Sequence, residues 1–250
     1  MLSIRNVSKS FGGNHVIQDV SLEFARGSLS AIIGPNGAGK TTLFNLICGT
    51  VRTDRGDILL DNISLRGLPP RMVAARGLAR AFQVASLFST FTPLESFSAA
   101  IASSHLGVKG LLSEFPRRQS LDKAHEVIEL LELGAVAHRP VAQLSHGDQK
   151  MVDIGIALCL SPSVLLLDEP TAGMGPEERW HMVETVQRLW KTTGLTVLFI
   201  EHDMDIVFSI AQDVTVLSYG AILARGAPAA VRSDPAVVTA YLGSHAEEIA

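Results

Sequence analysis

The chain has 250 residues, 47% of them hydrophobic, and a formal net charge of −4. This length suits one large α/β domain or two small ones, with enough apolar side chains for a sizeable core. The acidic balance argues against a basic nucleic-acid-binding surface, so no nucleic-acid partner is expected. No run of about 18 apolar residues occurs, so no transmembrane helix is expected. The N-terminal residues lack a signal-peptide pattern.

The first third of the chain predicts short strands separated by turns. Alternating or continuous apolar residues indicate the strands, and glycine and asparagine mark the turns between them. The expected strands are residues 2–7, 16–24, 29–33, 57–61 and 78–82. Together they suggest an antiparallel layer joined to a parallel core.

A glycine-rich stretch follows the third of these strands. It runs from Gly34 to Thr42, reads GPNGAGKTT and fits the phosphate-loop pattern G-x-x-x-x-G-K-[ST]. A strand before it and a helix after it, at residues 43–48, form the context that this pattern requires. Glycines let several backbone N–H groups point at one phosphate, and the helix N-terminus adds its positive dipole end. The alternative is a glycine turn that simply caps a helix.

Each residue of this loop has an expected role. Lys40 would reach the β- and γ-phosphates of ATP, and Thr41 would offer its hydroxyl to Mg²⁺. The residues expected to surround the phosphates are Asn36, Gly37, Ala38, Gly39, Lys40, Thr41 and Thr42.

The character of the chain changes over about residues 84–160, which read as a helical insertion. Helical periodicity covers residues 95–103 and 121–133, and the stretch between them reads as a loop. A parallel pattern then returns, with strands alternating with helices. Strands are expected at 164–168, 195–200, 214–217 and 221–225, and helices at 177–193, 204–211 and 235–242. The prediction is a mainly parallel sheet covered on both faces.

The strand at 164–168 ends in two carboxylates, Asp168 and Glu169. Carboxyl ends of parallel strands form the edge where α/β proteins bind ligands. Asp168 suits a Mg²⁺ ligand, and Glu169 suits the base that polarises an attacking water. The alternative is a strand end that caps the next helix.

A third element, LSHGDQK, precedes an apolar helix at 151–160. Ser145 and Gly147 at a helix start offer a hydroxyl and N–H groups to an anion, although a simple N-cap would look the same. About twenty residues before LLLDEP, this stretch resembles the LSGGQ signature of ABC-transporter ATPases. The resemblance implies one α/β P-loop NTPase domain over residues 1–250, with a RecA-like parallel sheet, an N-terminal antiparallel layer and a helical subdomain. It also implies that two such domains stand head to tail, with ATP between the phosphate loop of one and Ser145, Gly147 and Asp148 of the other.

The same resemblance assigns three further positions. Gln83 in AFQ resembles the glutamine that contacts Mg²⁺ and relays to the membrane partner, and His202 in IEHD resembles the histidine that contacts the γ-phosphate. Phe11 in SFGG resembles the aromatic residue that stacks on adenine. The implied catalytic set is therefore Glu169, His202, Gln83 and Lys40, and the implied metal set is Thr41, Gln83 and Asp168.

Three residues depart from the family pattern. His146 and Asp148 stand where the signature commonly has Gly and Gln, and Gly175 stands where the following loop commonly has Asp. The aspartate normally helps to couple the two ATP sites, so its replacement bears on coupling rather than hydrolysis.

Within the family, the chain is most similar to the ATPases of branched-chain, or hydrophobic, amino-acid uptake systems. The stretches that carry this likeness include FGGNHVIQDVSLEF, LLLDEPTAGMGPEE and the ending AVVTAYLG. The resemblance implies permease subunits, a second ATPase and, indirectly, a periplasmic binding protein as partners, at the cytoplasmic face of the membrane. Lipopolysaccharide-export or urea and amide ATPases, a soluble non-transport ABC protein and a small-molecule kinase are the alternatives.

Overall fold

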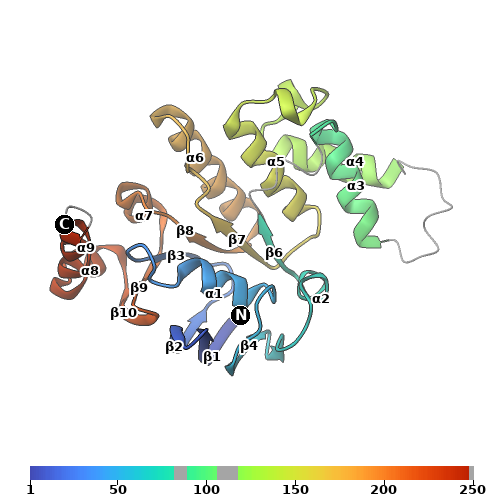
Figure 1. The fold of residues 1–250 in the computed structure, drawn as a ribbon. Helices are drawn as coiled ribbons and strands as arrows, with labels where there is room; N and C mark the ends of the chain where they lie inside the picture. Colours follow the sequence, from blue (N-terminus) through green and yellow to red (C-terminus); the bar gives the residue numbers. More distant parts are fainter. Residues whose placement is uncertain (82–88, 106–117, 248–250) are drawn as a thin grey trace.

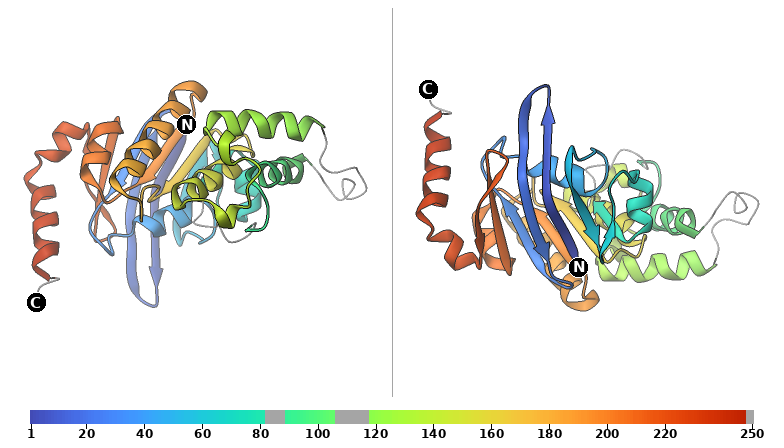
Figure 2. Two further views of the ribbon diagram at one scale, coloured as in Figure 1. Left: turned by 90° about the horizontal axis from the view of Figure 1, so that it is seen from above. Right: turned by 90° about the horizontal axis from the view of Figure 1, so that it is seen from below.

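Two β-sheets frame the computed structural model, which describes residues 1–81, 89–105 and 118–247 (Figure 1). The smaller sheet is antiparallel, with strand order β2-β1-β4-β5. Its strands are β1 (Leu2–Phe11), β2 (Asn14–Phe24), β4 (Arg55–Leu60) and β5 (Ile63–Ser64). The β1–β2 hairpin projects as a long ribbon (Figure 2).

The larger sheet has the order β10-β9-β3-β8-β7-β6, parallel except for β10, which runs antiparallel to β9. Its strands are β3 (Leu29–Ile33), β6 (Leu78–Ala81), β7 (Val164–Asp168), β8 (Thr196–Ile200), β9 (Asp213–Ser218) and β10 (Ala221–Gly226). Both faces are covered, so the central strands β3 and β8 are buried along their whole length and consist mainly of apolar residues. The predicted α/β architecture, with an antiparallel layer beside a mainly parallel sheet, is confirmed.

Helices cover both faces of the larger sheet (Figure 1). They are α1 (Lys40–Ile47), α2 (Pro70–Ala75), α3 (Pro93–His105), α4 (Arg118–Leu130), α5 (His146–Leu158), α6 (Pro176–Thr193), α7 (Met204–Ile210), α8 (Pro228–Arg232) and α9 (Pro235–Glu247). Two short 3₁₀ helices lie at Gly134–Val136 and Val141–Gln143.

Side-chain alternation along the central strands divides the interior into two cores. Leu165 and Leu167 point to the core that contains α5, α6 and α7, whereas Leu166 points to the core that contains α1 and the antiparallel sheet. Helix α1 is therefore sandwiched between the two sheets. Both cysteines are buried and free, and burial raises the pKa of Cys48 to about 11 and that of Cys159 to about 12, as expected of core thiols.

The structure differs from the predicted elements mainly at short elements and at helix ends. Three short elements have no counterpart among the predictions: helix α2 with six residues, helix α8 with five and strand β5 with two. Elements of this length are too short to show a periodicity. The predicted loop 104–120 is shorter: α3 continues to His105, and α4 begins at Arg118. Polar residues fill these helix ends, so apolar periodicity alone does not detect them.

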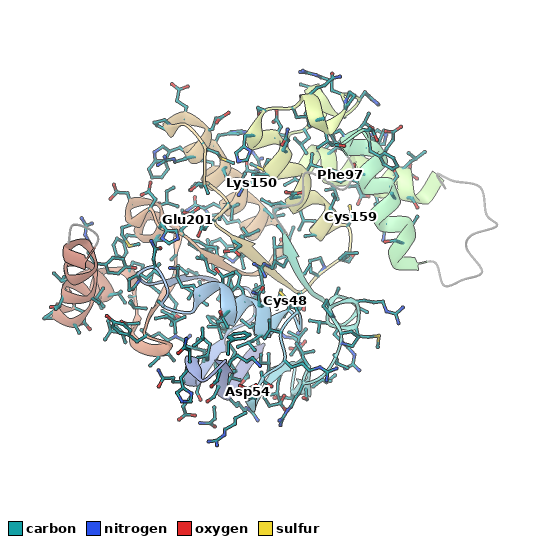
Figure 3. All side chains as sticks on the ribbon, viewed as in Figure 1. Cys48, Asp54, Phe97, Lys150, Cys159 and Glu201 are labelled. Atoms are coloured by element: carbon teal, nitrogen blue, oxygen red, sulfur yellow. The ribbon has the colours of Figure 1, made fainter. Side chains whose placement is uncertain are left out.

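Helices α3, α4 and α5, which come between β6 and β7 in the sequence, pack on one another (Figure 1). The buried ring of Phe97, labelled in Figure 3, lies at their centre together with Ile101, Ile128 and Leu131. The division of the chain into one domain with a helical subdomain over about 84–160 remains a prediction. Among the described residues, no helix is long and apolar enough to cross a bilayer.

The contact between α5 and Phe97 gives a stability prediction. A Cβ added at Gly155 would lie 2.2 Å from Cζ of Phe97, whose side chain is fully buried. We therefore expect Gly155→Ala to lower the free energy of unfolding by about 1–3 kcal/mol, despite the better helix propensity of alanine. Urea denaturation measures this. Gly134→Ala is the control, because nothing lies within 4 Å of a Cβ there; equal stabilities of the two variants would contradict the predicted clash.

Candidate nucleotide-binding and catalytic site

The phosphate loop connects β3 to α1, and three glycines shape it. Gly34, Gly37 and Gly39 have φ angles of 151°, 76° and 101°, a region that favours glycine. A Cβ at Gly34 would lie 2.1 Å from the carbonyl oxygen of Leu217, and one at Gly39 would lie 2.8 Å from that of Val16. The loop is thus pressed between β9 and β2, and only glycine fits at its two ends.

Lys40 closes the loop from inside. Its side chain is buried, and Nζ donates hydrogen bonds to the carbonyl oxygens of Gly34, at 2.7 Å, and Pro35, at 3.1 Å. Burial lowers the pKa of Lys40, while the nearby charges of Glu169 and Asp168 oppose that shift. The ammonium is therefore held where an anion cradled by the loop would meet it.

The other loop residues frame an anion at the start of α1. Asn36, Gly37 and Thr41 are exposed, Thr42 is half-buried, and Ala38 and Gly39 are buried. Free N–H groups at a helix start, together with the curled backbone, suit a phosphate. The tightly curled glycine backbone, which leaves no room for a Cβ at Gly34 or Gly39, and the buried ammonium of Lys40 both suit the binding of a nucleoside triphosphate.

Asp168 ends β7 and forms an ion pair with Arg80 of β6. Arg80 also donates to Oδ1 of Asn45 on α1 at 2.6 Å and lies over the ring of Phe44, 5.8 Å from its centroid. The arginine thus links two strands and α1 at the edge of the site. No sequence motif singles out Arg80, because its role depends on the pairing of β6 with β7.

Glu169 and His202 meet at the ends of neighbouring strands β7 and β8. Oε1 of Glu169 lies 2.8 Å from Nε2 of His202, and both side chains are partly exposed. Glu169 has a φ of 48°, which is uncommon for a residue with a Cβ and costs about 1–3 kcal/mol. Such strain persists where surrounding contacts enforce it, and it is typical of functional sites.

Glu201, labelled in Figure 3, is hydrogen-bonded to the main chain on both sides of the Glu169–His202 pair, at Thr171 and at His202. It is buried, and its Oε1 accepts hydrogen bonds from the backbone N–H and hydroxyl of Thr171 at 2.9 and 2.6 Å. Its Oε2 accepts from the N–H of His202 at 3.2 Å. This carboxylate ties together the loops that carry Glu169 and His202. No sequence pattern pointed to Glu201, because the burial of one acidic residue after a strand cannot be predicted from its neighbours.

The signature residues lie elsewhere, at the start of α5. Ser145 caps the helix: its Oγ accepts from the N–H of Asp148 at 3.1 Å and donates to Oδ2 of Asp148 at 3.0 Å. Gly147 lies near the side chains of Glu178 and Met174. Helix α5 and the phosphate-loop helix α1 pack on opposite faces of the sheet (Figure 1). Ser145, Gly147 and Asp148 therefore do not face the phosphate loop of their own chain.

Two further predicted site residues are less informative. Phe11 ends β1 with 47% of its surface exposed, and Nζ of Lys9 lies 5.1 Å from its ring centroid. Such a ring is available for stacking.

Gln83 lies outside the described residues, and in the described part no cluster of three or more His, Cys, Asp and Glu side chains could hold a metal. The oxygen donors of Thr41 and Asp168 nevertheless suit Mg²⁺ when phosphate oxygens complete the ligand set.

Strand β3, its glycine loop and α1, with Lys40 inside the loop and two carboxylates at the end of β7, two strands away in the sheet, define a P-loop nucleoside-triphosphate site. The sequence matches the ABC transporter family model over residues 17–172. Residues 221–247 match a second model, described as branched-chain amino acid ATP-binding cassette transporter. The chain therefore belongs to the ABC transporter family as an ATP-binding domain and is an ATPase of that type.

Curated relatives agree over nearly the whole chain. The high-affinity branched-chain amino acid transport ATP-binding protein LivG of Escherichia coli is 37% identical over 252 residues, covering 97% of this chain and 98% of that protein. BraF of Pseudomonas aeruginosa, with the same description, is 34% identical over 250 residues, covering 97% and 98%.

Solved structures show the same fold. The ADP conformation of an ATP-binding cassette of an ABC transporter superposes with a TM-score of 0.87 at 32% identity, covering 97% of this chain and 98% of that one. A nucleotide-free cassette superposes with a TM-score of 0.86 at 31% identity, covering 96% and 98%.

Proposed function

We propose that the chain is the ATP-hydrolysing subunit of an importer for branched-chain or other hydrophobic amino acids. The observation that carries the cargo assignment is the C-terminal segment. Residues 221–247, which include β10, α8 and α9, match the family model specific to branched-chain amino acid transporters. LivG and BraF, whose names specify branched-chain amino acids and which align over nearly their whole length, support the same cargo.

In the proposed mechanism, the phosphate loop and Lys40 hold the triphosphate, and Phe11 stacks on the adenine. Thr41, Asp168 and Gln83 would hold Mg²⁺, which would supply positive charge to the phosphate oxygens. Glu169 accepts a proton from the attacking water, and His202 contacts the γ-phosphate while holding the Glu169 carboxylate. Arg80 orients the Asp168 carboxylate through their ion pair, so that Asp168 would be in place to help hold the metal.

The site is completed by a second ATPase chain, either another copy or a sister chain. Its Ser145, Gly147 and Asp148 close over the triphosphate, which accounts for their position away from the phosphate loop of their own chain. ATP drives closure because the closed pair binds it better than the open pair does. Closure takes place at the cytoplasmic face of the membrane and moves integral-membrane permease subunits. A periplasmic binding protein delivers the amino acid to these subunits from the other side of the membrane.

Co-purification from detergent-solubilised membranes, followed by uptake into proteoliposomes, tests this function. We expect the tagged chain to retain two integral-membrane subunits and to support ATP-dependent uptake of radiolabelled leucine when the binding protein is present. Recovery without membrane subunits would indicate a non-transport ABC protein. Recovery with permeases that move urea, an amide or lipopolysaccharide instead would overturn the cargo assignment.

A further inference from the structure

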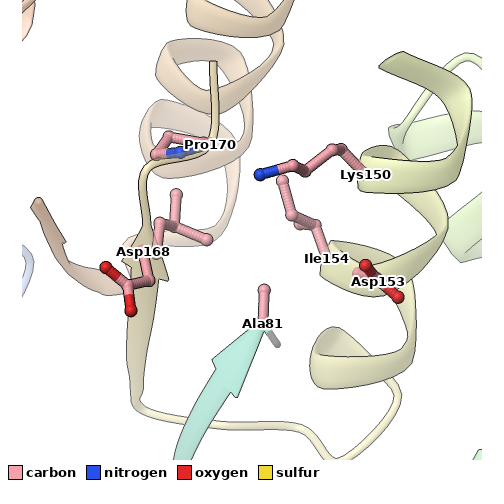
Figure 4. Close-up of a pocket in the computed structure, with 7 residues that line it drawn as sticks. Ala81, Lys150, Asp153, Ile154, Asp168 and Pro170 are labelled. Carbon is pink, nitrogen blue, oxygen red and sulfur yellow. The ribbon is translucent and has the colours of Figure 1, made fainter. Parts of the chain in front are cut away.

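Lys150 extends from α5 to the end of β7 (Figure 4). It lies five positions after Ser145, and only 7% of its surface is exposed. Its Nζ donates a hydrogen bond of 2.9 Å to the main-chain carbonyl oxygen of Glu169. In Figure 4 its ammonium faces the chain at Pro170, whereas the carboxylate of Asp168 points away from it.

The surroundings of Lys150 are costly for a charge. It lines a small pocket between α5 and the sheet together with Ala81, Ile154 and Leu167. Burial lowers its pKa, and the carboxylates of Asp153, Glu201, Glu169 and Asp168 oppose that shift. A buried ammonium is costly unless it is paired and hydrogen-bonded, so the hydrogen bond from Nζ to Glu169 matters for the charge of Lys150.

The carbonyl that Lys150 contacts belongs to the strained residue of the site. Glu169 has a φ of 48° and precedes Pro170, a position that favours extended backbone instead. Two main-chain hydrogen bonds hold Glu169. Its N–H donates to the carbonyl oxygen of Ile200 at 3.0 Å, and its carbonyl oxygen accepts from the N–H of Ala172 at 3.2 Å. Lys150 adds a third hydrogen bond, and this one comes from the helix that begins at the signature.

We propose that Lys150 is a positioning residue for ATP hydrolysis: it fixes the main chain at Glu169 so that the carboxylate stays beside His202. The proposal rests on the role proposed above for Glu169. It also gives a physical link between the two nucleotides of a closed pair. Helix α5 carries Ser145, which meets the nucleotide bound by the other chain, and Lys150 transmits the position of α5 to Glu169 of its own site.

Kinetics of the purified full-length chain test this role. We expect Lys150→Met to lower kcat for Mg²⁺-ATP by about 10- to 100-fold, as is typical when a supporting hydrogen bond to a catalytic group is removed. ATP affinity, KM and the melting temperature should stay near their wild-type values, because Lys150 touches neither the phosphate loop nor the ATP. Lys150→Arg, which can still donate to the carbonyl, should restore most of kcat. Lys191→Met, at an exposed site on α6, is the matched control.

Two results would overturn the proposal. Wild-type kcat in Lys150→Met is one. Parallel loss of kcat, ATP affinity and melting temperature in both Lys150→Met and Lys150→Gln is the other, because it would show that Lys150 only holds α5 in place. Glu169→Gln assayed alongside separates the two hypotheses. Normal turnover of Glu169→Gln would refute the role of Glu169 itself. If Glu169→Gln loses turnover while Lys150→Met turns over normally, only the positioning role of Lys150 is refuted.

Discussion

Replacing Lys40 with alanine is expected to abolish most ATP hydrolysis and to weaken ATP binding. The side chain is the buried cation of the phosphate loop, and its Nζ lies within hydrogen-bonding distance of two loop carbonyls. Without it, the charge that develops on the phosphate oxygens loses its nearest fixed counter-charge. Removal of one such preorganised donor lowers kcat by about 10²- to 10³-fold.

Phosphate release and titration with a fluorescent ATP analogue measure the two effects of Lys40→Ala. Lys191→Ala removes an equal charge from an exposed position on α6 and should leave both quantities unchanged. Circular dichroism should show a folded chain, because the loop shape is set by its glycines and by contacts with β9 and β2. Undiminished turnover after removal of this ammonium would refute the assignment of the phosphate loop.

Glu169→Gln is expected to separate ATP binding from hydrolysis. The amide keeps the size of the carboxylate and can still hydrogen-bond to Nε2 of His202, but it cannot take a proton from water. Loss of a general base lowers the rate by about 10²- to 10⁴-fold. ATP binding should persist, since the phosphate loop is intact, and the closed pair of chains should accumulate because hydrolysis no longer reopens it.

Single-turnover hydrolysis and size-exclusion chromatography with light scattering, with and without Mg²⁺-ATP, measure these outcomes. Glu184→Gln changes an exposed carboxylate on α6 and is the control. Wild-type turnover in Glu169→Gln would remove Glu169 from the mechanism. A monomer that stays monomeric with bound ATP would instead argue against completion of the site by a second chain.

Contiguous motifs were predictable from the sequence because local geometry is enough to define them. GPNGAGKTT forms the expected loop between β3 and α1, and the two carboxylates of LLLDE lie at the expected strand end. The resemblance of LSHGDQK to a signature also led to the correct family. Short elements such as α2 and β5 were missed, since so few residues show no period.

Tertiary structure decided which side chains meet across the sheet. Strands β7 and β6 are neighbours although β6 precedes the whole helical region, and this pairing brings Arg80 to Asp168, 88 residues away. Contacts of Glu201 with Thr171 depend in the same way on β8 lying beside β7. Neither contact has a sequence spacing that predicts it.

The sequence by itself determined the class of chemistry, because a phosphate loop, an acidic strand end and a signature are each short enough to be encoded in consecutive residues. Only the tertiary structure decided how the catalytic carboxylate is held. The strained backbone of Glu169, its contact with His202 and the hydrogen bond from Lys150 arise from the order of strands and the packing of α5, which no local pattern specifies.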